Sequence, residues 1–253
     1  MLTEILALVV PPRCLACRAP GRSAVDILCG ACRRALPWLE ARCCERCALP
    51  LPHRVVCPAR DAPFDAAWSA VAYEGVAREA MHALKFAAAR PLAEVMAAQI
   101  AAMVPVALLP RRSADASVAP DARGVRARQW TDRFIEAPVP DLAIVAVPAH
   151  PARRRSRGFD PAELLARALA RRSGLPLAAS LRRCAGAQRQ LGADRQTRRD
   201  AARLGFEARG PAPLTAILVD DVHTTGATLS ACAHALKRAG AQRVVALTWA
   251  RTL

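Results

Sequence analysis

The sequence predicts an α/β protein in which a parallel sheet with flanking helices follows a small cysteine-rich domain. Eight of the ten cysteines fall between residues 14 and 57. From residue 142 onward, continuous apolar stretches alternate with helical ones, which is typical of parallel strands that helices cover on both faces. Hydrophobic residues make up 53% of the 253 residues, and such a content excludes a wholly disordered protein.

The elements follow one another in a simple order. Residues 1–63 form the predicted cysteine-rich domain and residues 64–253 the α/β domain. Residues 105–140 are rich in Pro, Arg and Asp without clear periodicity, so we expect a long flexible insert there. Pro161 at the first turn and Gly240 after the last residue are helix start and stop signals. The expected strands are Ala66–Tyr73, Leu142–Val147, Ala216–Val219 and Arg243–Trp249, and the expected helices are Val76–Phe86, Leu92–Met103, Pro161–Arg172 and Thr228–Ala239.

The chain is strongly basic. Lys and Arg number 37 against 21 Asp and Glu, which gives a net charge of +16. Such a charge favours a polyanionic partner, which is a nucleic acid, a phosphorylated metabolite or an anionic membrane surface. Only Lys85 and Lys237 are lysines, and this excess of Arg is also what a GC-rich coding sequence produces. Charge alone therefore does not choose among these partners.

Two apolar stretches bear on location. Ile5 to Val10 has no basic residues before it and ends at Pro11, so it does not resemble a signal peptide or a membrane span. Val95 to Leu109 contains Gln99 and Pro105 and reads as an amphipathic helix. We expect a cytoplasmic protein without a membrane span. In a reducing cytosol, clustered cysteines hold metal rather than form disulfides.

The first four cysteines form two Cys-x-x-Cys pairs. Four thiolates at this spacing surround a tetrahedral Zn²⁺ and close its coordination shell, which predicts a structural or docking module rather than a catalytic centre. The ligands of this first site are Cys14, Cys17, Cys29 and Cys32.

A second site is incomplete in cysteine. Cys44 and Cys47 repeat the pair and Cys57 follows, but Arg60 stands where a fourth cysteine is expected. Either His53 or Cys43 completes a second zinc site with these three cysteines. The alternative is a metal-free ribbon held by hydrophobic contacts of Leu49, Leu51 and Val55.

The most specific segment is an acidic pair followed by a threonine-rich loop. A buried strand delivers Asp220 and Asp221 at its carboxyl end, where open α/β sheets bind ligands. Backbone N–H groups and hydroxyls at the start of the next helix suit a phosphate. The carboxylates suit neighbouring hydroxyls instead, which predicts a ribose 5-phosphate rather than simple helix capping. The phosphate-binding residues are Thr224, Thr225, Gly226, Ala227 and Thr228.

Val219 to Leu229 is similar to the 5-phosphoribosyl-1-pyrophosphate (PRPP) signature of type I phosphoribosyltransferases. Together with the cysteine ribbon, most of the chain resembles the ComF family of double-zinc-ribbon, phosphoribosyltransferase-like proteins. Other segments that carry this resemblance are Tyr73–Gly75, Leu84–Phe86, Val147–Pro148, Arg153–Phe159, Gln190 and Arg198–Arg199.

The resemblance implies a type I phosphoribosyltransferase-like fold and further ligand contacts. Arg153 and Arg157 become pyrophosphate contacts and Lys85 a phosphate contact, since a pyrophosphate and its Mg²⁺ need several fixed cations. The chain departs from the family at Asp160-Pro161, where Asn-Gln is usual, and at Asp200, where Asn is usual. His223 replaces an aliphatic residue, and we expect it to be a partly exposed loop residue.

Two functions follow as expectations. In the first, the protein is an enzyme in which Asp220 and Asp221 hold the ribose of PRPP while an acceptor displaces pyrophosphate. In the second, which the ComF resemblance implies through natural competence, it is a non-catalytic protein that handles single-stranded DNA, works with competence-machinery proteins and senses PRPP or another ribose phosphate. Aromatic residues are only 4% of the chain, which leaves few rings for stacking bases.

Overall fold

The computed structural model describes residues 13–21, 27–39, 42–53, 56–87, 89–103, 140–184 and 205–253. The expected insert at 105–140 lies outside this range except for its last residue. Also outside the described residues are Val55, the Gln190 to Asp200 segment and the N-terminal apolar stretch.

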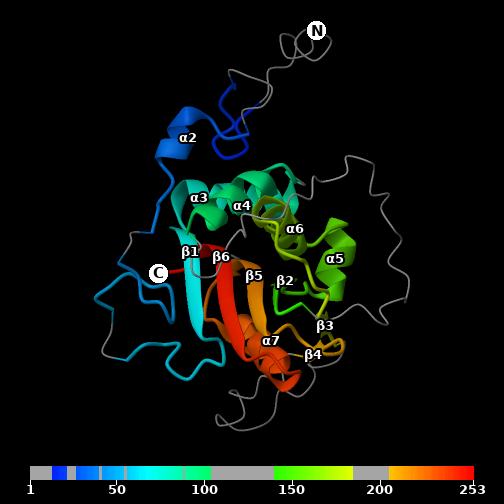
Figure 1. The fold of residues 1–253 in the computed structure, drawn as a ribbon. Coiled ribbons are helices and arrows are strands. Elements are labelled where there is room, and N and C mark those ends of the chain that lie inside the picture. The colour runs from blue at the N-terminus through cyan, green and yellow to red at the C-terminus, as the bar shows by residue number, and fades with distance from the viewer. Residues whose placement is uncertain are drawn as a thin grey trace, which may run out of the picture.

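A four-stranded parallel sheet forms the centre of the protein, in the order β1-β6-β5-β2 (Figure 1). The strand order brings the last strand of the chain between the first strand and β5, so the C-terminal residues lie in the middle of the sheet. All four carboxyl ends lie at one edge because every pairing is parallel. The strands are β1 (Ala66–Ala72), β2 (Leu142–Ala146), β5 (Thr215–His223) and β6 (Arg243–Arg251).

Helices cover both faces of the sheet, as the continuous apolar strands predict. One cluster packs Ile217 and Val219 of β5 against the first helix layer, and the other packs Ala216 and Leu218 against α7. The first layer consists of α3 (Gly75–Phe86), α4 (Leu92–Met103) and α6 (Pro161–Ser173), and α7 (Ala227–Arg238) lies on the other side (Figure 1).

The two cysteine segments pack on different faces. Cys14, Leu28 and Cys32 of the first belong to the cluster of α3 and α4. Cys47 and Phe64 belong to the cluster of α7. Because Phe64 shares a core with the second cysteine segment, the domain boundary at residues 63 and 64 stays a prediction.

The α/β class with its cysteine-rich N-terminal region is confirmed, and three small features were not expected. Helix α2 (Gly30–Arg34) starts directly after Cys29, and α5 (Pro151–Arg157) follows β2. Strands β3 (Leu181–Arg183) and β4 (Phe206–Ala208) form a separate antiparallel pair. These segments are short, and α5 has no buried residue, so none shows the apolar periodicity that reveals an element in sequence.

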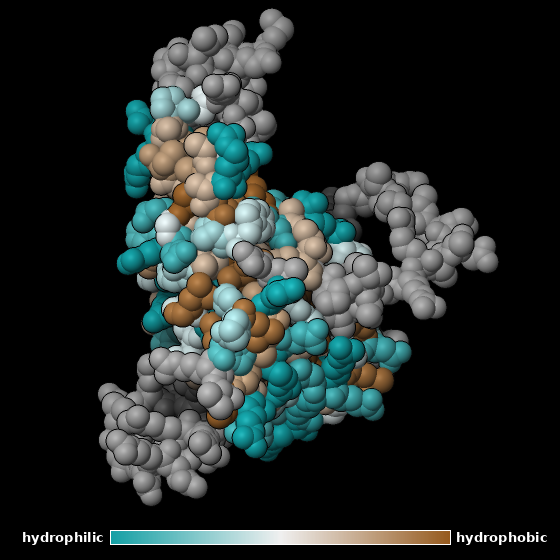
Figure 2. Space-filling model, turned by 90° about the vertical axis from the view of Figure 1, so that its left-hand side faces the viewer, coloured by the Kyte–Doolittle hydropathy of each residue, from teal (hydrophilic) through white to brown (hydrophobic). Residues whose placement is uncertain are grey.

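Two polar contacts between elements explain residues that interrupt apolar stretches. The indole Nε1 of Trp249 on β6 donates to Gln99 Oε1 on α4 at 2.6 Å. Ser69 on β1 and Thr248 on β6 share a buried hydrogen bond of 2.6 Å between their hydroxyls. In the described ranges no helix is long and apolar enough to cross a membrane. On the face seen in Figure 2, hydrophobic residues form small patches between hydrophilic ones.

Candidate metal centres and anion-binding loop

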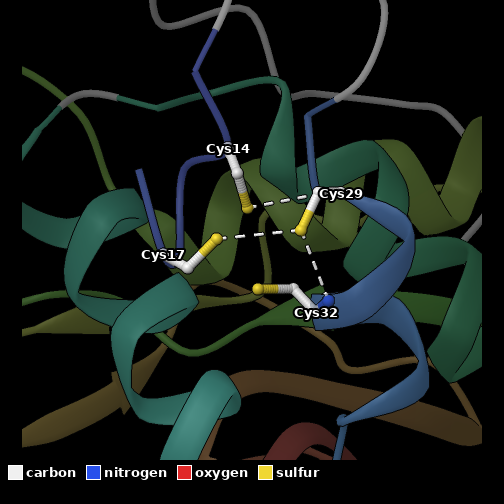
Figure 3. A group of neighbouring side chains, drawn as sticks. All are labelled: Cys14, Cys17, Cys29 and Cys32. Carbon is white, nitrogen blue, oxygen red and sulfur yellow. Dashed lines mark hydrogen bonds between the residues drawn. The ribbon is translucent and has the colours of Figure 1, made fainter. Parts of the chain in front are cut away.

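The four cysteines of the first cluster point toward one another (Figure 3). Their sulfur atoms all lie within 4.8 Å of one another, and Cys17 Sγ is 3.7 Å from Cys29 Sγ. A tetrahedron with Zn–S bonds of about 2.3 Å has an edge of about 3.8 Å, whereas a disulfide needs about 2.05 Å. The spacing therefore suits a structural zinc site.

Backbone donors prepare this cluster for metal. Burial raises the pKa of Cys14, but N–H groups of Cys29, Cys17 and Ala16 outweigh it and lower the value to about 6. Burial and the neighbouring thiols raise the pKa of Cys32. Four crowded thiols therefore resist full ionisation by themselves, and Zn²⁺ supplies the charge that displaces the remaining protons.

The second cluster repeats the backbone of the first. Cys14 N–H donates to Ala19 O and Cys44 N–H donates to Leu49 O, both at 2.8 Å. Arg18 and Ala48 then occupy the same left-handed conformation, with φ of 61° and 58°. Two hairpin knuckles of the same geometry thus start the two clusters.

His53 completes the second cluster. The four ligand atoms of Cys44, Cys47, His53 and Cys57 lie within 4.8 Å of one another, and Cys43 is not in this group. His53 Nε2 is 3.6 Å from Cys47 Sγ, and Cys44 Sγ is 3.8 Å from Cys57 Sγ. Of the two alternatives for the fourth ligand, the geometry favours His53. The missing cysteine at Arg60 is replaced by an imidazole from the loop before Cys57.

The acidic pair lies at the carboxyl edge of the sheet, and its two side chains have different surroundings. Asp221 Oδ2 is 2.8 Å from Lys85 Nζ in the last turn of α3, and both side chains are mostly buried. Asp220 Oδ1 accepts a hydrogen bond from the N–H of Asp221 at 2.8 Å. Burial raises the pKa of Asp220, and the negative charge of Asp221 raises it further. Hydroxyl donors at Asp220 would offset that desolvation.

The loop after β5 leaves backbone donors available. Gly226 adopts the left-handed conformation, with φ of 80°, immediately before α7. Within the described chain, no hydrogen bond uses the backbone N–H of Thr224, Thr225 or Gly226. Both threonines are exposed, and Ala227 and Thr228 form the first turn of the helix. These donors and the helix N-terminus together suit an anion.

His223 lies beneath this loop, so the expectation of a partly exposed loop residue is wrong. Its side chain is 2% exposed, and Nδ1 has no partner in the described part of the chain. A Cβ on Gly226 would come within 2.9 Å of His223 Nε2. Burial, followed by the charge of Arg251, lowers the pKa of His223 to about 4. The imidazole is therefore neutral at pH 7 and fills space under Gly226.

The two remaining predicted cations, Arg153 and Arg157, lie on α5. Arg157 places its guanidinium carbon 4.9 Å from the ring centroid of Phe86, the residue after Lys85. Arg153 is exposed, and no contact within the described ranges joins its side chain to the loop. The structure thus brings Lys85 to the acidic pair and places Arg157 over the ring of Phe86, but it leaves Arg153 apart.

Asp160 has a structural role at the position where the resemblance to the ComF family leads us to expect Asn. Its Oδ2 accepts from Ala149 N–H at 2.7 Å and its Oδ1 accepts from Ala162 N–H at 3.0 Å. The side chain caps α6 and fixes the turn after β2, and Pro161 occupies the first helical position, where no N–H is needed. Asp160 and Pro161 therefore suit the local backbone.

Sequence reasoning missed one residue that joins these parts. Arg251, the last residue of β6, is buried and donates to main-chain carbonyls of Cys47, His223 and Thr224. A single arginine at the end of a strand belongs to no recognisable sequence motif. Only the register of β6 beside β5, which pairs Arg251 with His223, reveals its place.

Comparisons with known proteins agree with the cysteine geometry. Residues 5–60 match the double zinc ribbon domain family, and both clusters fall inside this range. The chain is 29% identical over 255 residues to the DNA utilization protein YhgH of Salmonella typhi, with 97% of this chain and 100% of the relative aligned. The protein of the same name from Salmonella typhimurium strain LT2 aligns with the same identity and coverage.

We expect about two zinc ions per chain in protein purified without chelator, because each cluster offers four convergent ligand atoms. Cys17→Ser and His53→Ala should each remove about one zinc, whereas Cys43→Ser should remove none, as measured by elemental analysis. A zinc-free wild-type chain would rule out both centres. Loss of zinc in Cys43→Ser but not in His53→Ala would assign the fourth ligand to Cys43.

The pKa of His223 makes stability depend on pH. The unfolded histidine titrates near its ordinary value of 6.5 and the folded one near 4, so the unfolded state binds more protons between these values. His223 therefore disfavours folding as pH falls through this window, by about 2 kcal/mol between pH 7 and pH 5. Urea unfolding of the wild type and His223→Leu measures this difference at each pH. Parallel losses in the two proteins would contradict the assignment, since zinc release affects both equally.

Proposed function

We propose that this chain is a ComF-like protein that binds PRPP at the β5–α7 loop and acts in DNA uptake or use. Its double zinc ribbon and its near-full-length similarity to DNA utilization proteins support this proposal. The observation that carries the proposal is the juxtaposition of Asp220 and Asp221 with loop amides before α7 that have no hydrogen-bond partner within the described ranges. Because the cysteine clusters suit a reducing compartment, we assign this role to the cytoplasm.

In the proposed complex, the chain's residues divide the ligand between them. The amides of Thr224 to Gly226 and the hydroxyl of Thr228 would hold the 5-phosphate, and the acids would accept hydrogen bonds from the ribose hydroxyls. Lys85 Nζ lies 2.8 Å from Asp221 Oδ2, and its positive charge would reduce the repulsion between the two acids and the phosphates of PRPP. Bound Mg²⁺ would neutralise part of the pyrophosphate charge.

The same arrangement would support transfer to an amine or nucleobase nitrogen. The acceptor's lone pair would form a bond to ribose C1 while the C1–O bond breaks, and pyrophosphate would leave with that electron pair. The acceptor nitrogen would then lose its proton to water. Asp220 and Asp221 would stabilise the positive charge that develops on the ribose as this bond breaks.

Calorimetry with PRPP and Mg²⁺ tests the site. We expect the wild type to bind PRPP with a micromolar dissociation constant and the double variant Asp220→Ala/Asp221→Ala to give no binding heat. The control, Asp61→Ala/Asp141→Ala, removes the same charge from exposed positions and should bind normally. Equal affinity in the site variant and the wild type would refute the role of the acids, and a wild type that does not bind would refute the proposal.

A second candidate function, contact with single-stranded DNA, is favoured by the surface of α5 and the end of α3. Helix α5 carries Arg153, Arg154, Arg155 and Arg157 among seven residues, none of them buried. Phe86 is 64% exposed, and its ring lies 4.7 Å from the His82 ring and 4.9 Å from the Arg157 guanidinium. A cationic surface with an exposed ring suits an unpaired base between phosphates.

Fluorescence anisotropy with a labelled oligothymidylate tests this surface. We expect Arg155→Gln/Arg157→Gln to lower the slope of log affinity against log salt by about 1.4, since each lost phosphate contact removes about 0.7. Phe86→Ala should weaken binding about tenfold without changing the slope. The charge-matched control, Arg238→Gln/Arg243→Gln, lies at the opposite edge of the sheet. An equal effect of both arginine pairs would show that binding depends on the net charge of the protein and not on the surface of α5, which would contradict this candidate function.

A further inference from the structure

The guanidinium of Arg251 connects three parts of the chain. Its Nε donates to the carbonyl of Cys47, a ligand of the second cluster, at 2.9 Å. Its Nη1 donates to the carbonyls of His223 at 2.9 Å and Thr224 at 2.5 Å, where β5 becomes the proposed phosphate loop. The same nitrogen also donates to Thr252 O at 2.6 Å. One side chain therefore fixes the first residues of the loop relative to the second zinc ribbon.

The guanidinium of Arg251 is buried, so losing any of these hydrogen bonds would be costly. Arg251 is 5% exposed, and no carboxylate lies within ion-pair distance of it in the described ranges. A buried cation without a negative partner is costly unless its hydrogen bonds are filled. A zinc ion bound by three thiolates and a neutral histidine carries a net charge of −1, and Cys47 belongs to that set. The loaded second cluster thus provides both an acceptor and a compensating charge.

The second ribbon is placed to act on the loop, and the first is not. Ala67 N–H on β1 donates to Glu45 O at 2.7 Å, and Arg46 donates to the carbonyls of Ala59, Ala62 and Asp65. These bonds hold the knuckle of Cys44 and Cys47 against β1 and the segment that leads into it, and β1 pairs with β6, the strand that carries Arg251. The first ribbon instead packs on the cluster of α3 and α4, and no hydrogen bond of the described chain joins it to the β5–α7 loop.

We propose that Arg251 is a positioning residue that makes the shape of the Thr224–Gly226 loop depend on zinc in the second cluster. Metal binding orders a zinc ribbon, because ribbon segments seldom hold their shape without the ion. With zinc, Cys47 O stays in place and Arg251 holds Thr224 O. Without zinc, Arg251 loses an acceptor and the nearby negative charge, and the loop loses its fixed start. The consequence for phosphate affinity rests on the function proposed above.

The matched variants Cys57→Ser and Cys17→Ser test this coupling. Each should lose one zinc, from the second and the first cluster respectively. In Cys57→Ser, we expect amide hydrogen exchange of residues 221–229 to accelerate and PRPP affinity to fall, each about tenfold. In Cys17→Ser, both should match the wild type. Equal exchange of this segment in Cys57→Ser and the wild type, or an equal change in the two variants, would overturn the proposal.

Arg251→Lys separates the arginine from the metal. A lysine keeps the charge but cannot direct a planar fork of N–H groups at carbonyls from separate segments. We expect this variant to retain both zinc ions and still show the faster loop exchange of Cys57→Ser. If loop exchange in Arg251→Lys stays at the wild-type rate, Arg251 does not transmit the effect of zinc to the loop.

Zinc content and hydrogen exchange do not depend on the ligand. A wild type that fails to bind PRPP but shows the expected exchange pattern would refute the proposed function and leave the coupling intact. Normal PRPP binding together with loop exchange that is independent of the second zinc would refute the coupling alone.

Discussion

A buried arginine, Arg251, with no carboxylate partner among the described residues is the constraint on which the proposed site depends. Charged groups rarely leave water without hydrogen-bond partners, and Nε and Nη1 of Arg251 find acceptors on backbone carbonyls of three separate segments. Backbone acceptors tie the guanidinium to main-chain position rather than to a flexible side chain. Any movement of the second ribbon or of the end of β5 therefore leaves a buried donor unsatisfied, which costs about 1–3 kcal/mol.

Parallel topology brings these segments together. Because β6 lies between β1 and β5, the C-terminal strand ends beside the acidic pair and beside the segment that follows the second ribbon. Each face of a parallel sheet must be covered, and the two ribbons add to different covering layers. The repeated knuckle thus lies in two different surroundings. The first ribbon extends the helical layer of α3 and α4. The second packs beside β1 on the α7 side, and Arg251 links it to the end of β5.

The sequence reveals features whose chemistry lies in local spacing. The Cys-x-x-Cys pairs, the apolar strands and the Asp-Asp-Thr-rich segment are each readable within about a dozen residues, and the structure gives them the elements expected. Features that depend on distant segments are not readable in this way. His53 could not be chosen over Cys43 without knowing how the hairpin folds, and the burial of His223 depends on Phe64 and Arg251, which are remote in sequence.

The ion pair of Lys85 with Asp221 bears on how a sugar phosphate would enter. Two adjacent carboxylates next to a phosphate site repel each other and the ligand. Burial is the largest cause of the raised pKa of Asp220, and the negative charge of Asp221 raises it further. Lys85 offsets the charge of Asp221, with which it forms an ion pair. Asp220 accepts a hydrogen bond from the backbone N–H of Asp221 and has acceptor capacity left for hydroxyls. The lysine thus makes the acids suitable for a sugar beside a phosphate, and without it the same two acids would favour a cation instead.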